Sequence, residues 1–279
     1  MSGRIQTTTR AFLAAAACAA MAVGTLGANS APASAGGTWD GLQAEVIGTR
    51  SVQSGRGVIT LMAPARPDDQ RAVPVAIDAR FSDGRTVKTV TLVVDENPMP
   101  VAAVFNMGPN QRHVAFKTAI RLNQQTEIRA IVEASDGALY MTSRLVKFAG
   151  GQAACAAPPT GNPEEIAANM GKMKLADVPS EGNATQIEHD IRLTISHPNH
   201  TGMAMDQQTL LYIPLRMIST LEVQQGDVKL FDMTGSITIA ENPYFEFPVS
   251  LIADHNLKVV LKDSEGTEWT RTLPIRAGS

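Results

Sequence analysis

The sequence is poor in cysteine and has no large excess of either charge. Its 279 residues include two cysteines, Cys18 and Cys155, and no Cys-x-x-Cys, Cys-x-x-Cys-His or His-Glu-x-x-His motif. These absences exclude the commonest zinc-finger, haem-attachment and metalloprotease signatures. The formal net charge of -3 provides no positive field for a phosphate backbone, so we exclude nucleic acid as a partner.

Catalytic patterns are equally scarce. No order of Ser, His and Asp and no pair of carboxylates with catalytic spacing rises above chance in a chain of this length. His197 and His200 could together hold a metal, but Pro198 predicts a turn and no third ligand is nearby, so we expect surface residues. We therefore predict no catalytic residues, no cofactor and no metal site.

The start of the chain has the features of an export signal. Arg4 and Arg10 form a positive region, an Ala-rich apolar run covers residues 11–28, and Ala33-Ser34-Ala35 is a small-residue cleavage motif. The run is short and leads into the cleavage motif, which favours a cleaved signal over a membrane span. We therefore predict a signal peptide over residues 1–35 and a periplasmic mature protein without a membrane span.

Removal of Cys18 with the signal peptide would leave Cys155 as the single thiol. An unpaired cysteine in an exported protein is either an intermolecular linker or a reactive thiol. Cys155 lies in a Gly/Ala-rich stretch, residues 147–159, which can bury little apolar area, so we expect it to be exposed and mobile. Gly150 and Gly151 would form the hinge of an arm that reaches about 25 Å, at roughly 3.3 Å per extended residue. With no basic residue close in sequence, activation of the thiol would have to come from a partner.

Both sides of this stretch show the two-residue alternation of β-strands between turn-forming residues. Before it, strands are predicted at 58–63, 73–81, 88–94, 102–106, 113–122, 127–134 and 139–148. After it, strands are predicted at 187–196, 210–213, 218–224, 228–233, 244–251, 256–261 and 268–275. The pattern predicts an all-β protein with two immunoglobulin-like β-sandwich domains, although the Cys, Trp and Cys spacing of a true immunoglobulin domain is absent.

The region between the two β patterns contains a helix start. Asn162 is a suitable cap, Pro163 fits the first helical position, and Glu165 follows three residues after the cap. A short helix to about Met170 is predicted, followed by a linker over residues 172–184. The predicted organisation is a signal peptide at 1–35, a first sandwich at 36–150, a cysteine-bearing arm and linker at 151–185, and a second sandwich at 186–279.

Two sets of motifs resemble known proteins. The first half resembles the SoxY sulfur carrier in Asp95-Glu96-Asn97-Pro98, Arg129-Ala130-Ile131-Val132-Glu133 and Val146-Lys147-Phe148-Ala149-Gly150-Gly151. The second half resembles SoxZ, the partner of SoxY, in His197-Pro198, Thr201-Gly202 and Glu241-Asn242-Pro243-Tyr244-Phe245-Glu246-Phe247. Together the matches cover nearly all of the predicted mature chain. The chain is therefore similar to the fused SoxYZ-like carriers associated with quinoprotein dehydrogenases.

The resemblance implies a periplasmic, non-catalytic carrier of the kind used in thiosulfate and sulfur oxidation. In SoxY a cysteine on a Gly-rich arm holds sulfur intermediates covalently while separate enzymes act on them, and Cys155 is the matching position. The resemblance also implies pairing of the two halves within the chain, and periplasmic redox partners such as c-type cytochromes or a quinoprotein dehydrogenase. The SoxY arm ends in Gly-Gly-Cys-Gly-Gly, whereas this arm continues into the second half and is anchored at both ends.

A hypothesis from another class remains open. A periplasmic adaptor would dock a quinoprotein dehydrogenase or its cytochrome through its sheet edges, and Cys155 would be incidental. An enzyme acting alone is a third, more remote interpretation. The carrier predicts that Cys155→Ser abolishes function without affecting folding, whereas the adaptor predicts that the same change is silent.

Overall fold

The strands of the molecule follow the predicted alternation of buried and exposed side chains. In β3 (Val73–Arg80) every second residue from Val73 to Ala79 is buried, and the residues between them are exposed or half-buried. The computed structural model describes residues 37–148, 150, 152–178, 188–250 and 252–275. The predicted signal peptide, and Cys18 with it, lies outside the described residues.

Helices are few and strands are many in both halves of the described chain. The first half contains α1 (Gly37–Ile47), β1 (Val52–Ser54), β2 (Ile59–Met62), β3, β4 (Val87–Val94), β5 (Val101–Met107), β6 (His113–Ile120), β7 (Thr126–Ala134) and β8 (Leu139–Val146). The second half contains η1 (Ala154–Ala156), α2 (Pro163–Asn169), β9 (Met173–Asp177), β10 (Glu188–Ile195), β11 (Ile218–Gln225), β12 (Val228–Gly235), β13 (Tyr244–Ser250), β14 (Asn256–Asp263) and β15 (Glu268–Pro274).

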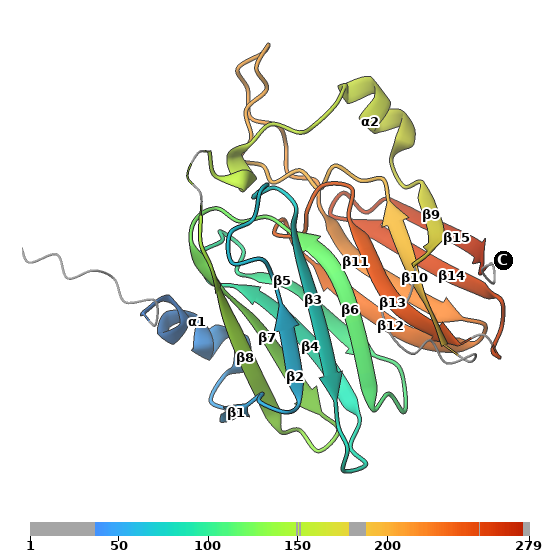
Figure 1. Ribbon diagram of the computed structural model, residues 1–279. Coiled ribbons are helices and arrows are strands. Elements are labelled where there is room, and N and C mark those ends of the chain that lie inside the picture. The colour runs from blue at the N-terminus through green and yellow to red at the C-terminus, as the bar shows by residue number, and fades with distance from the viewer. Residues whose placement is uncertain (1–36, 149, 151, 179–187, 251, 276–279) are drawn as a thin grey trace, which may run out of the picture. The chain divides into compact units, whose positions relative to one another are not determined.

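Within the described residues the strands form two sheets (Figure 1). One sheet has the order β1-β8-β7-β4-β5-β12-β11-β14-β15, and the other has the order β2-β3-β6-β13-β10-β9. In each sheet the strands from β1 to β8 are neighbours at one end, and the strands from β9 to β15 are neighbours at the other end. Each half is a two-layered sandwich, which confirms the predicted all-β fold with two immunoglobulin-like domains.

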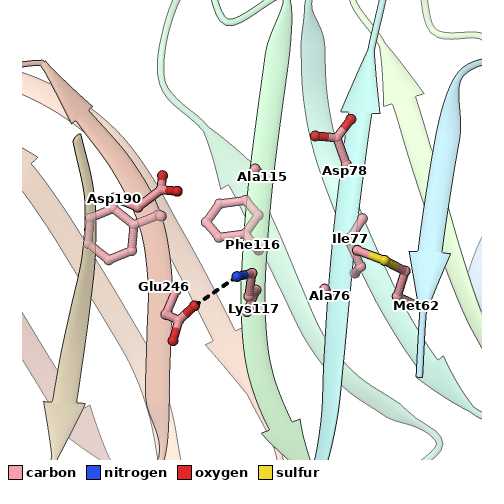
Figure 2. A pocket seen from close by; sticks show the side chains of 10 residues that line it. Met62, Ala76, Ile77, Asp78, Ala115, Phe116, Lys117, Asp190 and Glu246 are labelled. Carbon is pink, nitrogen blue, oxygen red and sulfur yellow. Dashed lines mark ion pairs between the residues drawn. The ribbon is translucent and has the colours of Figure 1, made fainter. Parts of the chain in front are cut away.

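The two halves meet along strand edges in both sheets. In the first sheet β5 pairs antiparallel with β12, from Met107 opposite Phe231 to Ala103 opposite Gly235. In the second sheet β6 and β13 meet where Lys117 lies opposite Glu246, and Figure 2 shows the ion pair between them, with an Nζ to Oε2 distance of 3.4 Å. The halves are thus joined by main-chain hydrogen bonds as well as by side chains.

Aromatic side chains fill the core at this junction. Phe105 of the first half packs on Phe116 with ring centroids 4.7 Å apart. Phe231 of the second half lies edge-on to Phe116 at 5.1 Å and to Phe247 at 5.1 Å. All four rings are buried, and aromatic pairs of this geometry contribute beyond the area they remove from water. The junction therefore has a continuous apolar core.

The sequence patterns did not predict helix α1. Its two glycines, Gly37 and Gly41, weaken a helical pattern, yet the helix is held in place by tertiary contacts. Trp39 is buried and lies 4.7 Å from the guanidinium of Arg129, which forms a buried ion pair with Asp95 at 2.7 Å. The helix therefore packs through a cation–π contact that no local pattern in the sequence reveals.

The region between the halves differs in part from the prediction. Helix α2 is present, and the Asn162 side chain accepts a hydrogen bond from the Glu164 N–H at 2.8 Å, as expected of a cap. The predicted linker at 172–184 is wrong over residues 173–177, which form β9 and pair antiparallel with β10. The strand predicted at 210–213 is also absent, because this segment forms the exposed side of a hairpin loop held by one isolated β-bridge.

Candidate functional site: a buried cysteine between two sheets

Cys155 is buried, with 0% of its surface exposed, and the expectation of an exposed thiol is wrong. It occupies η1, the short 3-10 helix that follows the Gly/Ala-rich stretch. The main-chain N–H of Cys155 donates to Oδ1 of Asn123 at 2.9 Å, and the N–H of Ala154 donates to the carbonyl of Leu122 at 3.3 Å. The side chains of η1 are too small to fix its position by apolar burial alone. Hydrogen bonds to its main chain fix it instead.

The second half of the chain holds the other side of η1. The hydroxyl of Thr201 donates to the main-chain carbonyl of Cys155 and in turn accepts from the N–H of Met203 at 3.1 Å. Thr201 lies in the loop between β10 and β11 and is buried. Cys155 therefore bridges the two halves, with Asn123 on one side and Thr201 on the other.

Arg121 is a buried cation near the thiol. Its Nη1 donates to the carbonyls of Asn199, Ile237 and Ile239 at 2.8–3.0 Å, and its Nη2 donates to the carbonyl of Pro198 at 3.2 Å. No carboxylate forms an ion pair with Arg121 among the described residues. The guanidinium thus fastens the end of β6 to the loops of the second half.

Burial determines the protonation of Cys155. Desolvation raises the pKa of its thiol to about 11, and the positive charge of Arg121 opposes this rise without cancelling it. No basic residue lies close to Cys155 in the sequence, but the fold brings the charge of Arg121 near it, and this charge does not activate the thiol. Activation by a partner stays a prediction. At neutral pH the buried group is a protonated thiol, which is a poor nucleophile.

The expected hinge is only partly described. Gly150 has a φ of 95°, a conformation that favours glycine, and its carbonyl accepts a hydrogen bond from Gln70 at 3.4 Å. Gly151 lies outside the described residues. A hinge at Gly150 and Gly151 thus remains a prediction.

His197 and His200 differ from the surface pair that was expected. His197 is buried, its Nδ1 accepts from the N–H of Asn199 at 3.0 Å, and its Nε2 is 3.9 Å from Asp263, beyond hydrogen-bond range. Burial lowers the pKa of His197 to about 4, so the ring is neutral at physiological pH. No group of three or more potential ligand side chains that could hold a metal ion was found among the described residues.

Sequence reasoning missed the residues around the thiol. Asn123 and Thr201 lie 32 and 46 positions from Cys155, and no spacing rule connects them to it. Thr201-Gly202 did belong to the motifs that resemble SoxZ, which was the one available signal. The site thus combines a cysteine that the sequence singled out with polar residues that only the fold brings to it.

Comparisons with protein families match each half separately. The family described as sulfur oxidation protein SoxY matches residues 43–153, and the family described as sulphur oxidation protein SoxZ matches residues 179–274. The chain is a fused SoxYZ-like protein. Its SoxY domain supplies β1 to β8, and its SoxZ domain supplies β10 to β15. Pairing of SoxY with SoxZ therefore occurs within one chain, along the β5–β12 and β6–β13 edges.

Solved structures give a weaker comparison. The sulfur carrier protein SoxY from Chlorobium limicola f thiosulfatophilum is 22% identical over 41% of this chain and 99% of its own, with a TM-score of 0.33. The superoxide reductase (neelaredoxin) from Ignicoccus hospitalis is 14% identical over 39% of this chain and 90% of its own, with a TM-score of 0.28. A search of curated proteins found no match.

Proposed function

We propose that this SoxYZ-like protein is a periplasmic, non-catalytic carrier that holds a sulfur-containing intermediate on Cys155 for partner redox enzymes. The position of Cys155 carries the proposal. It lies two residues beyond the SoxY match and is attached to the SoxZ domain through Thr201. It is also the free cysteine of the described chain. A single thiol between the two domains is where a carrier shared by both would bear its cargo.

The buried position requires a movement before cargo can be attached. A thiol with no exposed surface and a pKa of about 11 reacts poorly at neutral pH, because the thiolate is the nucleophile. We propose that η1 leaves its site, with Gly150 and Gly151 as the hinge. Three hydrogen bonds, to Asn123, Leu122 and Thr201, oppose this movement. At about 1 kcal/mol each, their loss lies within what the binding of a partner can offset.

Attachment of thiosulfate shows the chemistry that such a carrier needs. The thiol of Cys155 loses its proton, and its sulfur forms one S–S bond with the terminal sulfur of thiosulfate. Two electrons leave the pair, and c-type cytochromes of the periplasm are the proposed acceptors, with a quinoprotein dehydrogenase as the alternative. The sulfur of Cys155 is oxidised together with thiosulfate in this step, and the partner enzyme catalyses the reaction and passes on the two electrons.

The location and domain organisation complete the proposal. A cleaved signal peptide over residues 1–35 would deliver the protein to the periplasm, with SoxY and SoxZ sandwiches at 36–150 and 186–279 on either side of the arm at 151–185. No helix among the described residues is long and apolar enough to cross a membrane. A protein purified from the periplasm should therefore start near Gly36 and retain Cys155 as its only thiol.

Intact-mass analysis of the protein from an actively growing culture tests the carrier. We expect a mass increment that is removed by reductant and that maps to the peptide containing Cys155. Cys155→Ser should abolish function in the pathway while leaving folding intact, with Ser143→Ala as a control in an exposed strand position. An unmodified Cys155 during turnover, together with a fully active Cys155→Ser variant, would refute the carrier and favour the adaptor hypothesis.

A further inference from the structure

Exposed apolar side chains are concentrated in one loop of the SoxZ domain. The loop between β10 and β11 contains a hairpin, residues 204–213, that we name the leucine hairpin. Leu210, Leu211 and Tyr212 are exposed by 68%, 68% and 66%, and Met205 by 37%. With the neighbouring Leu215, these make up five of the ten exposed large apolar side chains among the described residues. A contiguous apolar group of this kind is typical of an interaction site.

The leucine hairpin is held in a defined shape. Met205 and Tyr212 form a β-bridge, and the N–H of Ile213 donates to the carbonyl of Ala204 at 2.9 Å. At the tip, Asp206 accepts hydrogen bonds from the N–H groups of Gln208 and Thr209 and from the Thr209 hydroxyl. The exposed side chains are therefore displayed by a hydrogen-bonded turn rather than by an irregular segment.

One backbone position of the hairpin is strained. Leu210 has a φ of 57°, in the left-handed region that favours glycine and is unusual for leucine. A strained, exposed leucine costs free energy and contributes nothing to the core of this chain, so its presence points to a role outside the chain. Residues in such conformations cluster at binding sites, where the surrounding structure maintains them.

A groove lies between the leucine hairpin and the segment that follows Cys155. Figure 1 shows the hairpin, in pale orange, beside the segment that leads into α2. The groove has a volume of about 660 Å³. Its apolar lining includes Pro158, Pro159, Pro163, Ile166, Ala167, Met170 and Ile213.

The charges that line the groove are of one sign. Glu164 and Asp206 are its carboxylates, and no Lys or Arg is among its described lining residues. Hydrogen bonds from Thr209 and Gln208 lower the pKa of Asp206, so its carboxylate is ionised at neutral pH. The third titratable group, His200, has a pKa lowered by burial and by Arg121 and is neutral there. The face is thus apolar with an acidic border.

The groove borders chain segments that are attached to the main chain of Cys155, although Cys155 itself is not among its lining residues. Thr201, at the base of the loop that bears the hairpin, donates to the Cys155 carbonyl. Pro158, which lines the groove, is three residues after Cys155. A protein that binds here therefore contacts both the hairpin and the chain that continues from the thiol.

We propose that the leucine hairpin and this groove form the docking face for the partner protein that loads or unloads Cys155, an inference that rests on the carrier function. The partner presents an apolar pocket that accepts Leu210, Leu211 and Tyr212, bordered by Lys or Arg side chains that face Glu164 and Asp206. Buried apolar anchors supply affinity, and the opposite charges at the border guide association. The partner binds residues 158–167, which follow η1 in the chain, and it binds them better when η1 has left its site. Its binding therefore favours the released form of η1.

A second copy of this chain fits the face less well. In a two-fold dimer the same surface patch is used by both subunits, so the carboxylates of one copy would face a patch whose described lining has no Lys or Arg to pair with them. Like charges at such an interface oppose association. A dimer would also cover the segment next to Cys155 in both copies.

Photo-crosslinking in the producing cells tests the docking face. A benzophenone amino acid replaces Tyr212 in one full-length variant and Gln208, which lines the groove, in a second. It replaces Ile252, which is 79% exposed and lies outside the face, in a control. We expect one and the same protein to be crosslinked from positions 212 and 208 but not from 252. The yield of this crosslinked product should fall at least tenfold with Leu211→Asp, which removes an apolar anchor, or with Glu164→Lys, which reverses a charge at the border. High salt should also lower the yield, because it screens the charges at the border.

Adduct formation distinguishes this inference from the carrier function. Leu211→Asp should reduce the adduct on Cys155 in cells at least tenfold, and Ile252→Asp should leave it unchanged. Reaction of the purified variant with a small thiol reagent should match the wild type, since no docking is required. Crosslinking to a second copy of this chain, or equal loading of Leu211→Asp and wild type, would overturn the docking face. A wild-type protein that never carries an adduct would instead overturn the carrier, while the crosslinks still report whether the face binds a protein.

Discussion

The hydroxyl of Thr201 donates a hydrogen bond to the main-chain carbonyl of Cys155, and this bond links the SoxZ domain to the segment that follows the SoxY domain. On the opposite side the N–H of the same residue donates to Asn123 of the SoxY domain. The thiol is thus held by its main chain between two domains, while its side chain takes no part in either bond. The main chain of Cys155 therefore makes both bonds without any contribution from its sulfur.

Removal of the Thr201 hydroxyl should make Cys155 more reactive. Thr201→Val keeps the shape of the side chain but leaves the Cys155 carbonyl without its donor, which costs about 1 kcal/mol. If reaction requires η1 to leave its site, the population of the open form rises about fivefold, since 1.4 kcal/mol corresponds to a factor of ten. The rate of modification by a disulfide reagent at pH 8 should rise by the same factor.

The control for this experiment is Thr60→Val, an exposed position in β2. It should leave the rate of thiol modification unchanged. A Cys18→Ser background ensures that the reaction reports Cys155 alone in the full-length chain. Equal rates in Thr201→Val and the wild type would show that the bond does not limit access to the thiol.

The raised pKa of Cys155 predicts a shifted pH profile. The ordinary pKa of a thiol is near 9, and burial raises that of Cys155 to about 11. Between pH 9 and pH 11 the thiol keeps its proton when η1 is in its site and loses it when η1 is released. The free energy that favours the buried position of η1 therefore falls as pH rises from about 9 to about 11. The rate of alkylation by iodoacetamide should keep increasing through pH 9 in the native protein.

The comparison is the same protein in denaturant, where the thiol is exposed. Its alkylation rate should level off near pH 9, as expected of an ordinary thiol. Thiolate absorbance measured in parallel provides an independent titration of the same group. A native profile that levels off near pH 9 would mean that Cys155 is already exposed in solution.

The sequence predicted the strands well and the environment of the thiol badly, for one physical reason. A strand can be predicted because apolar and polar residues alternate along it, and the apolar ones lie on the buried face, as do Val73, Val75 and Ile77. The burial of Cys155 is determined by Asn123 and Thr201, whose main-chain contacts leave no pattern near residue 155. Composition alone suggested a mobile arm, because Gly and Ala bury little surface, but hydrogen bonds to the main chain can fix such a segment.

Loss of the Arg121 side chain should destabilise the contact between the domains. Arg121→Met removes the donors to the carbonyls of Pro198, Asn199, Ile237 and Ile239 in the SoxZ domain. Each buried carbonyl left without a donor costs roughly 1–3 kcal/mol. Because the variant no longer buries a positive charge, part of this cost is offset, and we expect the free energy of unfolding to fall by about 2–4 kcal/mol. Denaturant-induced unfolding measures this loss.

Arg144→Met is the matched control, because Arg144 lies on β8 and is exposed. It should change the free energy of unfolding by less than about 0.5 kcal/mol. Arg121→Met should also raise the pKa of Cys155 further, because the nearby positive charge lowers it in the wild type. Unchanged stability would contradict the role of Arg121 as the link between β6 and the SoxZ loops.

The approach of the two domains along β5 and β12 should not tolerate a methyl group at Gly108. A Cβ atom at this position would lie 1.8 Å from the carbonyl oxygen of Lys229, a main-chain atom that cannot turn aside. The N–H of Gly108 also donates to the carbonyl of Leu230 at 2.8 Å. Gly108→Ala should therefore separate the strand edges and destabilise the protein by about 1–3 kcal/mol or more.

Hydrogen exchange locates this effect. In Gly108→Ala, protection should fall at the amides of the β5–β12 ladder, such as Met107 and Phe231, and persist in the β3–β6 ladder within the SoxY domain. Gly41→Ala is the control, because Gly41 lies in α1 with open space around it, and alanine favours a helix by up to about 1 kcal/mol. If Gly108→Ala proves as stable as Gly41→Ala, β5 and β12 do not pair in solution. The two domains would then be separate sandwiches that do not share a sheet.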